Sequence, residues 1–415
     1  MRSALLALAL GLAALGPASA QAFSPNAEPN AEPDAAARFA TCLRELRALA
    51  EGRGVPPALA EAQLSGLGPD PAVLAAANRQ AEFVRPIWEY IEATVTDARV
   101  ETGRAKLAEW APTLDTIERT YGVDRHILVA IWGVESTYGA VLEDPGIVRP
   151  VVRSLATLAC GDAKRGAYWR DELVAALGIL AKGDVSPERM TGSWAGAMSH
   201  TQFMPMTFRD HAVDFDGDGR RDIWGSIPDA LASTASCLRT SGWRPGEGWG
   251  FEVSLPDGFD YRLADETTER PLSEWLERGL KPADGRPVGD PEARAALALP
   301  AGAGGPAFLL RPNFRVILRY NTALSYALTV AHLSDRLRGQ GGFARDWPRD
   351  KRPLSQDEIR DLQTKLSARG HEAGGVDGKM GPKTRAAIRA FQEAAGLTPD
   401  GFADADLLTR LAANP

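Results

Sequence analysis

The sequence has few cysteines and histidines. Three cysteines and five histidines occur in 415 residues, and no group of them has the spacing of zinc ligands. A zinc hydrolase is therefore not supported. The sequence also lacks a stripe of Lys and Arg interrupted by aromatic residues, and its formal net charge of -7 would repel nucleic-acid phosphates. We expect no nucleic-acid partner.

The N-terminal apolar run is too short to cross a bilayer. It extends from Ala4 to Leu15, whereas a membrane span needs roughly 20 apolar residues. Arg2 precedes this run and Ala18-Ser19-Ala20 follows it, a pattern typical of a cleaved signal peptide over residues 1–20. The alternative is an uncleaved anchor. No cysteine stands directly after the cleavage site, so we expect a periplasmic protein with no lipid on its N-terminus and no transmembrane segment in the mature chain.

In an exported protein the cysteines can form disulfides, because the compartment outside the cytosol is oxidising. Cys160 closes the apolar segment SLATLAC, and Cys237 lies in the helix-like segment DALASTASCLRTSGW. Both can face one core, so we predict a disulfide between Cys160 and Cys237, with Cys42 left over. The alternative is three small buried thiols, since spacing alone does not fix the pairing.

Composition divides the chain into two folded parts. Its 44% hydrophobic and 24% charged residues are ordinary globular values, and 415 residues exceed one small domain. A Pro- and Ala-rich stretch predicts a flexible linker over residues 21–35, and a Gly-rich break predicts a second linker over 341–352. The main domain then covers residues 36–340, and a compact C-terminal domain covers 353–415.

Helical periodicity dominates the main domain. Apolar residues recur at helical spacing from about residue 36 to 180, as in Phe39, Leu43 and Leu46, and again over 323–337. Between Trp243 and Pro312, Gly and Pro are dense, and the runs FEVSL and FRVILRY favour a small amount of sheet or irregular structure. The predicted fold class is mainly α with a small α/β or irregular insertion.

Glu135 is the most unusual acid of the main domain. It stands near the end of residues 127–139, a segment apolar on nearly every side and therefore a buried helix. Burial of an ionised carboxylate is costly, so this acid is either paired or held neutral by a raised pKa, in which case it can donate a proton. A satisfied structural Glu is the alternative, although the helix dipole disfavours negative charge at that end.

Two further segments carry polar groups in ordered patterns. Residues 193–205, SWAGAMSHTQFMP, read as the wall of a close-fitting polar pocket, with Ser193 and Gln202 as its candidates. Residues 214–222, DFDGDGRRD, match the start of an EF-hand calcium loop. Gly225 stands where the final bidentate Glu belongs, so Asp229 would have to replace it. The alternative is a solvated turn; the predicted metal ligands are Asp214, Asp216, Asp218, the Arg220 carbonyl and Asp222.

The motifs WGVESTYG and SWAGAM…TQFMP resemble those of the lytic transglycosylase B family, which cleaves peptidoglycan and has a lysozyme-like helical core. The resemblance continues in AVDFDGDGRRDIW and RYNTALSYALTVAHLSDRL, and so covers roughly residues 36–340. The C-terminal pattern LQxxLxxxG…DGxxGxxTxxAIxxFQ resembles the three-helix peptidoglycan-binding domain. Two amphipathic helices are expected there, with Ile359, Leu362 and Leu366 on one face and Thr384, Ala387, Ile388 and Phe391 on another.

The resemblance implies a reaction and a set of residues. Glu135 would protonate the glycosidic oxygen between N-acetylmuramic acid and N-acetylglucosamine and then take the proton of the muramyl 6-hydroxyl, which closes a 1,6-anhydro ring. No cofactor would be needed for the chemistry, and a Ca²⁺ ion in the EF-hand-like loop would be structural. The partner is the glycan strand of peptidoglycan, with wall-enzyme complexes as further partners and a monomer as the expected state. The cleft would be lined by Ser193, Gln202, Tyr90, Tyr320, Asn321 and Tyr326, although core packing also explains the aromatic residues.

The sequence departs from this family in two places. Ser199-His200-Thr201-Gln202 stands where the family usually has Gly-x-x-Gln, and Cys237 stands where a Tyr is common. Two alternative functions remain open. A glycosidase that uses water would need a second carboxylate beside Glu135. The acids in the loop that follows Glu135 are Glu143 and Asp144. A noncatalytic wall-binding scaffold would need no acid.

Overall fold

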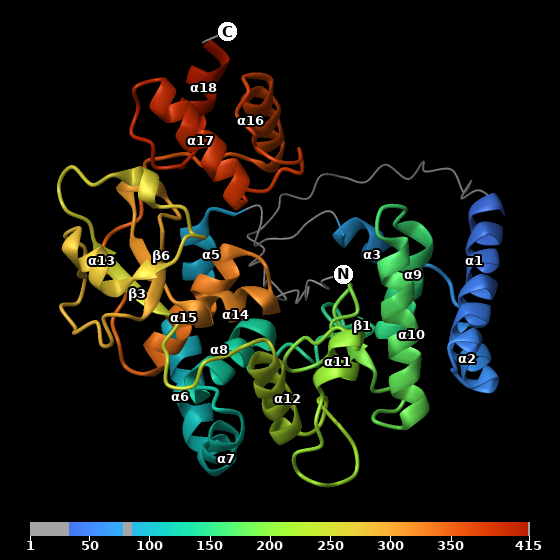
Figure 1. The fold of residues 1–415 in the computed structure, drawn as a ribbon. Coiled ribbons are helices and arrows are strands. Elements are labelled where there is room, and N and C mark those ends of the chain that lie inside the picture. The colour runs from blue at the N-terminus through green and yellow to red at the C-terminus, as the bar shows by residue number, and fades with distance from the viewer. Residues whose placement is uncertain (1–32, 78–84, 414–415) are drawn as a thin grey trace. The chain divides into compact units, whose positions relative to one another are not determined.

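The computed structural model describes residues 33–77 and 85–413, most of them in helices (Figure 1). These residues form two compact units. One comprises residues 33–77, 106–121 and 131–237, and the other comprises residues 85–105, 122–130 and 238–413. The expected signal peptide lies outside the described residues, as does most of the expected linker. The first helix begins at Pro33, inside the stretch that we expected to be a linker.

The first unit is helical apart from a two-stranded ribbon. Its helices and strands are α1 (Pro33–Gly52), α2 (Pro57–Leu64), α3 (Pro71–Ala76), α7 (Ala111–Tyr121), α9 (Val151–Gly161), α10 (Gly166–Lys182), α11 (Pro205–His211), β1 (Arg149–Pro150) and β2 (Thr191–Gly192). Helices α6 (Asp97–Glu109), α8 (Arg125–Ser136) and α12 (Ile227–Thr240) have residues in both units. The strands β1 and β2 pair antiparallel.

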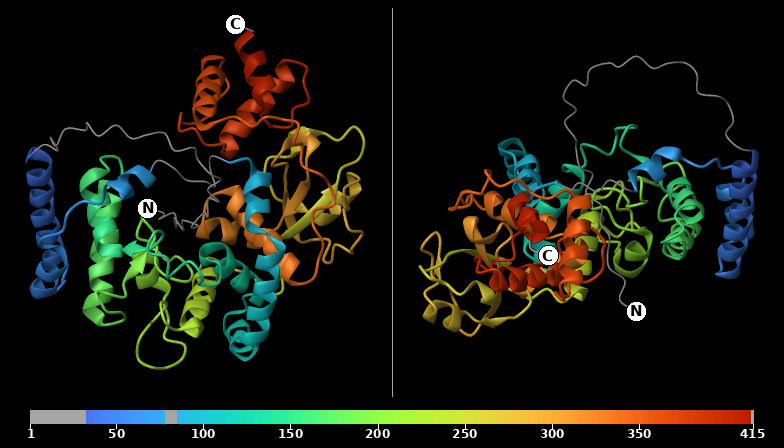
Figure 2. Two further views of the ribbon diagram at one scale, coloured as in Figure 1. Left: turned by 180° about the vertical axis from the view of Figure 1, so that it is seen from behind. Right: turned by 90° about the horizontal axis from the view of Figure 1, so that it is seen from above.

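Helices α9 and α10 form the centre of the first unit. They lie side by side in both views of Figure 2, and α1, α2 and α3 pack against α9. Residues on every side of α9 are buried, which agrees with its apolar sequence VVRSLATLAC. Helix α10 ends at Lys182 and is capped by Gly183, whose φ of 75° is the left-handed conformation that glycine adopts most readily.

The second unit combines helices with a five-stranded antiparallel sheet. Its strands occur in the order β4-β6-β7-β3-β5. Its elements are α5 (Ile87–Thr94), β3 (Gly250–Ser254), a 3₁₀ turn (Tyr261–Leu263), β4 (Arg270–Pro271), α13 (Leu272–Glu277), β5 (Lys281–Pro282), β6 (Arg294–Ala298), a 3₁₀ turn (Gly302–Gly304), β7 (Ala307–Leu310), α14 (Pro312–Tyr320) and α15 (Leu324–Leu337). The sheet lies where the sequence indicated it, and α15 confirms the helix expected over 323–337.

The prediction of strand or irregular structure for FRVILRY was wrong. These residues form helix α14, which begins at Pro312. Proline is well tolerated in the first turn of a helix because its missing N–H has no helical partner there. Phe314, Ile317 and Tyr320 recur at a spacing of three and are all buried. Burial of this face outweighs the strand preference of Val316 and Ile317.

Three helices form the C-terminal part of the second unit. They are α16 (Gln356–Ala368), α17 (Pro382–Ala394) and α18 (Ala405–Ala413). Ser355 caps α16 through a reciprocal capping box with Glu358. The predicted faces of α16 and α17 meet in one core, which contains Ile359, Leu362, Leu366, Ala387, Ile388 and Phe391 together with residues of α18.

Two buried glutamines hold the loops after α16 and α17. The side-chain oxygen of Gln363 accepts a hydrogen bond from the backbone N–H of Gly378, and its amide group donates to the Asp377 carboxylate and the Lys379 carbonyl. Gln392 makes the same three bonds, with Gly401, Asp400 and Phe402. The two loops are therefore closed by one hydrogen-bonding pattern, used twice.

Residues 33–77 and 85–413 contain no helix that combines the length and the apolar character of a membrane span.

Candidate active site

Glu135 lies in the last turn of α8 and is fully buried. Its side chain has 0% exposure, and residues Ile127 to Val134 around it are also buried. This confirms the buried helix that the sequence predicted. The chain leaves α8 through Thr137 and Tyr138, whose φ values of 52° and 59° are positive although neither residue is glycine. Non-glycine residues in this conformation cost free energy and occur often at functional sites.

Trp132 and Ser136 flank Glu135 and contact the backbone or ring of His200. The indole N–H of Trp132 donates to Nδ1 of His200 at 3.1 Å, and the two rings meet edge to face. The hydroxyl of Ser136 donates to the His200 carbonyl at 2.7 Å. These contacts join the end of α8 to the segment that contains Gln202. Sequence analysis did not select Trp132 or His200, because 68 positions separate them.

The segment from Ser193 to Phe203 folds into two tight turns. The Ser193 hydroxyl accepts hydrogen bonds from the N–H groups of Ala195 and Ala197, and Met198 forms isolated bridges with Gly192 and Phe203. The amide group of Gln202 donates to the Ser199 carbonyl at 2.7 Å. Ser193 and Gln202 are both fully buried. They share the first unit with Glu135, whereas their contact with a substrate stays a prediction.

Ser199 and Gln202 have φ values of 58° and 52°. Non-glycine residues in the left-handed region therefore follow α8, at Thr137 and Tyr138, and also lie beside His200, at Ser199 and Gln202. The Ser199 hydroxyl donates to the Ile223 carbonyl at 2.7 Å, which fixes this turn against the acidic loop that follows.

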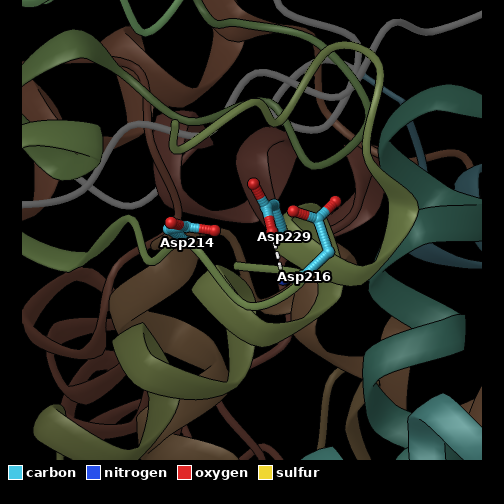
Figure 3. A group of neighbouring side chains, drawn as sticks. All are labelled: Asp214, Asp216 and Asp229. Carbon is cyan, nitrogen blue, oxygen red and sulfur yellow. Dashed lines mark hydrogen bonds between the residues drawn. The ribbon is translucent and has the colours of Figure 1, made fainter. Parts of the chain in front are cut away.

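The acidic loop places three carboxylates close together. Ligand oxygens of Asp214, Asp216 and Asp229 all lie within 4.8 Å of one another, and Figure 3 shows the three side chains grouped. Asp229 also accepts hydrogen bonds from the N–H groups of Phe215, Asp216 and Asp222, so it closes the loop from α12. Burial raises the pKa of its carboxyl above the ordinary value. Such hard oxygen donors suit Ca²⁺.

The remaining predicted ligands lie outside this cluster of three. The Asp218 carboxylate binds the guanidinium of Arg220, and the Asp222 carboxylate accepts from the N–H groups of Trp224 and Gly225. A side chain at position 225 would have its Cβ only 2.5 Å from the Arg189 guanidinium. A Glu at the position that ends an EF-hand loop would therefore require the Arg189 and Asp222 side chains to shift, and the carboxylate that lies beside Asp214 and Asp216 is that of Asp229.

Four predicted substrate contacts lie in the second unit. Tyr90 is on α5, Tyr320 and Asn321 are at the end of α14, and Tyr326 is on α15. Helix α15 packs against both α5 and α14, so these residues occupy neighbouring helices of that unit. Each of them is at most 5% exposed. Contact with a glycan stays a prediction for all four.

The predicted disulfide was wrong. Cys160 on α9 is bonded to Cys42 on α1, and Cys237 on α12 is a buried free thiol. The reason is the packing of the first unit, in which α1 lies against α9. The apolar sequence around Cys160 predicts that this residue is buried, but it does not show which cysteine forms the disulfide with it.

Comparison with known proteins identifies both parts of the chain. Residues 38–335 match the family described as "Transglycosylase SLT domain", and residues 355–411 match "Putative peptidoglycan binding domain". Membrane-bound lytic murein transglycosylase B of Escherichia coli (strain K12) is 32% identical over 249 residues, which are 59% of this chain and 65% of that protein. The aligned part is thus just under two thirds of the length of this relative.

Two solved structures extend the comparison. SltB3 from Pseudomonas aeruginosa in complex with NAG-anhNAM-pentapeptide is 46% identical, with a TM-score of 0.85 over 90% of this chain and 99% of that one. The Escherichia coli lytic transglycosylase SLT35 in complex with calcium is 27% identical, with a TM-score of 0.61 over 72% of this chain and 92% of that one. The mainly helical, lysozyme-like fold that the motifs implied is confirmed, and the chain belongs to the transglycosylase SLT family.

Proposed function

We propose that the chain is a lytic transglycosylase of the periplasm. It cleaves the β-1,4 bond between N-acetylmuramic acid and N-acetylglucosamine of peptidoglycan and leaves 1,6-anhydromuramyl ends. The observation that carries this proposal is the complete burial of Glu135 at the end of an apolar helix. In such surroundings the protonated form of an acid is favoured, and a protonated acid can donate to a leaving oxygen. SltB3, which is 46% identical, has been solved with an anhydromuramyl ligand.

The other buried carboxylates of the first unit support a single catalytic acid. In the described residues these are Glu172, Asp184, Asp222 and Asp229. Glu172 accepts from the Met206 N–H, Asp184 binds Arg221, and the other two hold the acidic loop. Glu143 and Asp144 are exposed. A water-activating partner for Glu135 is therefore not favoured by these residues.

The cleavage uses the carboxyl group of Glu135 twice. Glu135 gives its proton to the glycosidic oxygen as the bond to the muramyl C1 breaks, and the 2-acetamido group stabilises the positive charge that develops. The carboxylate then removes the proton of the muramyl 6-hydroxyl while that oxygen bonds to C1. Glu135 returns to its starting state, and no water is consumed. Ser193, Gln202, Tyr90, Tyr320, Asn321 and Tyr326 are the proposed contacts of the sugars.

The C-terminal domain, residues 353–415, would hold the enzyme on its insoluble substrate. Tethering a binding domain to a catalytic domain raises the effective concentration of the active site at the wall. Asp214, Asp216 and Asp229 would hold a structural Ca²⁺, which stiffens the acidic loop without taking part in the chemistry. The Cys42–Cys160 disulfide fits the oxidising periplasm that the signal-like N-terminus predicts.

Mass spectrometry of the muropeptides released from purified peptidoglycan tests the proposal. The parent protein should release fragments with anhydromuramyl ends, and Glu135→Gln should release none. Glu143→Gln is the matched control, because it neutralises an exposed acid nearby in sequence and should leave the products unchanged. Reducing ends would identify a hydrolase instead, and an absence of products from the parent would favour a noncatalytic scaffold.

A further inference from the structure

His200 lies outside the metal-binding cluster found among the described residues, and it contacts helix α8 at two points. Its ring receives the indole N–H of Trp132 at 3.1 Å, and its carbonyl receives the Ser136 hydroxyl at 2.7 Å. Trp132 precedes Glu135 by three residues, and Ser136 follows it directly. One residue from outside α8 therefore holds the helix on both sides of the buried acid.

The hydrogen bonds define the state of the His200 ring. An indole N–H can only donate, so Nδ1 of His200 must be an acceptor without a proton. The proton of the neutral ring is then on Nε2. Burial lowers the pKa of His200 to about 4, which keeps the ring neutral near pH 7. The contact with Trp132 thus selects one tautomer of the ring.

The turn after α8 lies against the His200 ring. A Cβ placed on Gly139 would lie 2.5 Å from Cε1 of His200 and 2.8 Å from its Nδ1, so the ring lies directly against the glycine backbone. The neighbouring Ser199 is anchored by its hydrogen bond to the Ile223 carbonyl. His200 therefore contacts both α8 and the 137–139 turn, and its neighbour Ser199 is anchored to Ile223.

We propose that His200 is a positioning residue for Glu135, acting through Trp132 and Ser136. The inference rests on the proposed function, in which the carboxyl of Glu135 must donate a proton to the glycosidic oxygen and then accept one from the muramyl 6-hydroxyl. Loss of the ring contact frees the last turn of α8 while Glu135 itself is retained. Misplacement of a catalytic group by about 1 Å can reduce a rate by on the order of 100-fold. The cost should appear in kcat, because His200 is not placed against the substrate.

Kinetics on soluble glycan strands of defined length test the proposal. His200→Phe keeps a ring but removes both polar atoms, and its kcat should fall about 10- to 100-fold while KM changes less than about threefold. His200→Asn should recover part of the loss, because its side-chain oxygen can accept from Trp132. In the double variant of His200→Phe with Trp132→Phe, kcat should fall no further than in His200→Phe, since both changes remove one contact.

Trp169→Phe is the matched control. Trp169 is also a fully buried tryptophan of the first unit, and its indole N–H donates to the Asp162 carboxylate at 2.9 Å, away from α8. This variant also loses one buried indole hydrogen bond, and its kcat should stay within about twofold of the parent's. Equal losses of kcat in Trp169→Phe and Trp132→Phe would show that destabilisation, and not positioning, explains the effect. A kcat of His200→Phe within twofold of the parent's would overturn the proposal.

NMR spectra of ¹⁵N-labelled protein supply a readout that does not need activity. In His200→Phe, the indole resonance of Trp132 and the backbone amide resonance of Glu135 should both move, whereas in Trp169→Phe they should not. If the parent protein releases no products, the proposed function fails, and the spectra alone decide the role of His200. An unchanged Glu135 resonance in a folded His200→Phe variant would then contradict it.

Discussion

Cys42 on α1 is covalently bonded to Cys160 on α9, across 118 positions of the sequence. A crosslink that closes so long a loop restricts the unfolded chain strongly. The Cys42→Ser/Cys160→Ser double variant should lose about 3 to 5 kcal/mol of free energy of unfolding, as measured by urea denaturation. Cys237→Ala should retain the crosslink, and a denatured parent without reductant should show one reactive thiol. Recovery of a peptide that joins Cys160 to Cys237 would contradict the structure.

The carboxylate of Asp229 should decide whether the acidic loop responds to calcium. Addition of Ca²⁺ stabilises a folded protein that binds it, so the melting temperature of the parent should rise with the Ca²⁺ concentration and fall after chelation. Asp229→Asn should abolish this response. Asp218→Asn should retain it, because the Asp218 carboxylate binds Arg220 and lies outside the cluster. A response lost in Asp218→Asn but kept in Asp229→Asn would favour the ligand set that the motif predicted.

Glu172 should make stability depend on pH. Burial raises the pKa of its carboxyl from 4.5 to about 7. Between these two values the folded protein keeps a proton that the unfolded chain has lost, so stability falls as the pH rises through this window and levels off above pH 7. Glu172→Gln should remove this slope, worth up to about 3 kcal/mol. Urea denaturation at several pH values measures it, with Glu143→Gln, which changes an exposed acid, as the control that keeps the slope.

A side chain at position 139 should destabilise the folded protein. Its φ is 90°, and an added Cβ would lie 2.5 Å from the His200 ring. Gly139→Ala should therefore destabilise the protein by about 1 to 3 kcal/mol in thermal or urea unfolding. Gly178→Ala is the control, because Gly178 lies within α10 and has open space around it. That change should stabilise the helix by about 0.5 to 1 kcal/mol. Equal effects of the two substitutions would mean that the packing around Gly139 is looser than described.

Features with a local cause could be predicted from the sequence. The helix around Glu135 and the faces of α16 and α17 follow from the spacing of apolar residues, which determines burial directly. Short runs were less reliable. In FRVILRY the β-branched residues favour a strand, but the helix start at Pro312 and the burial of Phe314, Ile317 and Tyr320 prevail.

Features that depend on distant segments could not be predicted. The disulfide partner of Cys160 depends on the packing of α1 against α9, and a segment 68 positions away brings His200 to Trp132. The acidic motif correctly indicated a group of carboxylates, and Asp229 was foreseen as a replacement for Gly225. The pairing of Asp218 with Arg220 is a side-chain contact that the spacing of the motif does not reveal.

In the C-terminal domain, Gln363 and Gln392 hold turns of the same shape in two loops of different length. Gln363 grips an Asp-Gly-Lys tripeptide that begins 14 positions later, and Gln392 grips an Asp-Gly-Phe tripeptide that begins only 8 positions later. Both glycines have nearly the same φ, 73° and 75°. The three hydrogen bonds of each glutamine involve only the tripeptide, so the same bonds close two loops of different length. The geometry of the turn is thus set by the glutamine and the tripeptide, and the distance between them along the chain differs between the two loops.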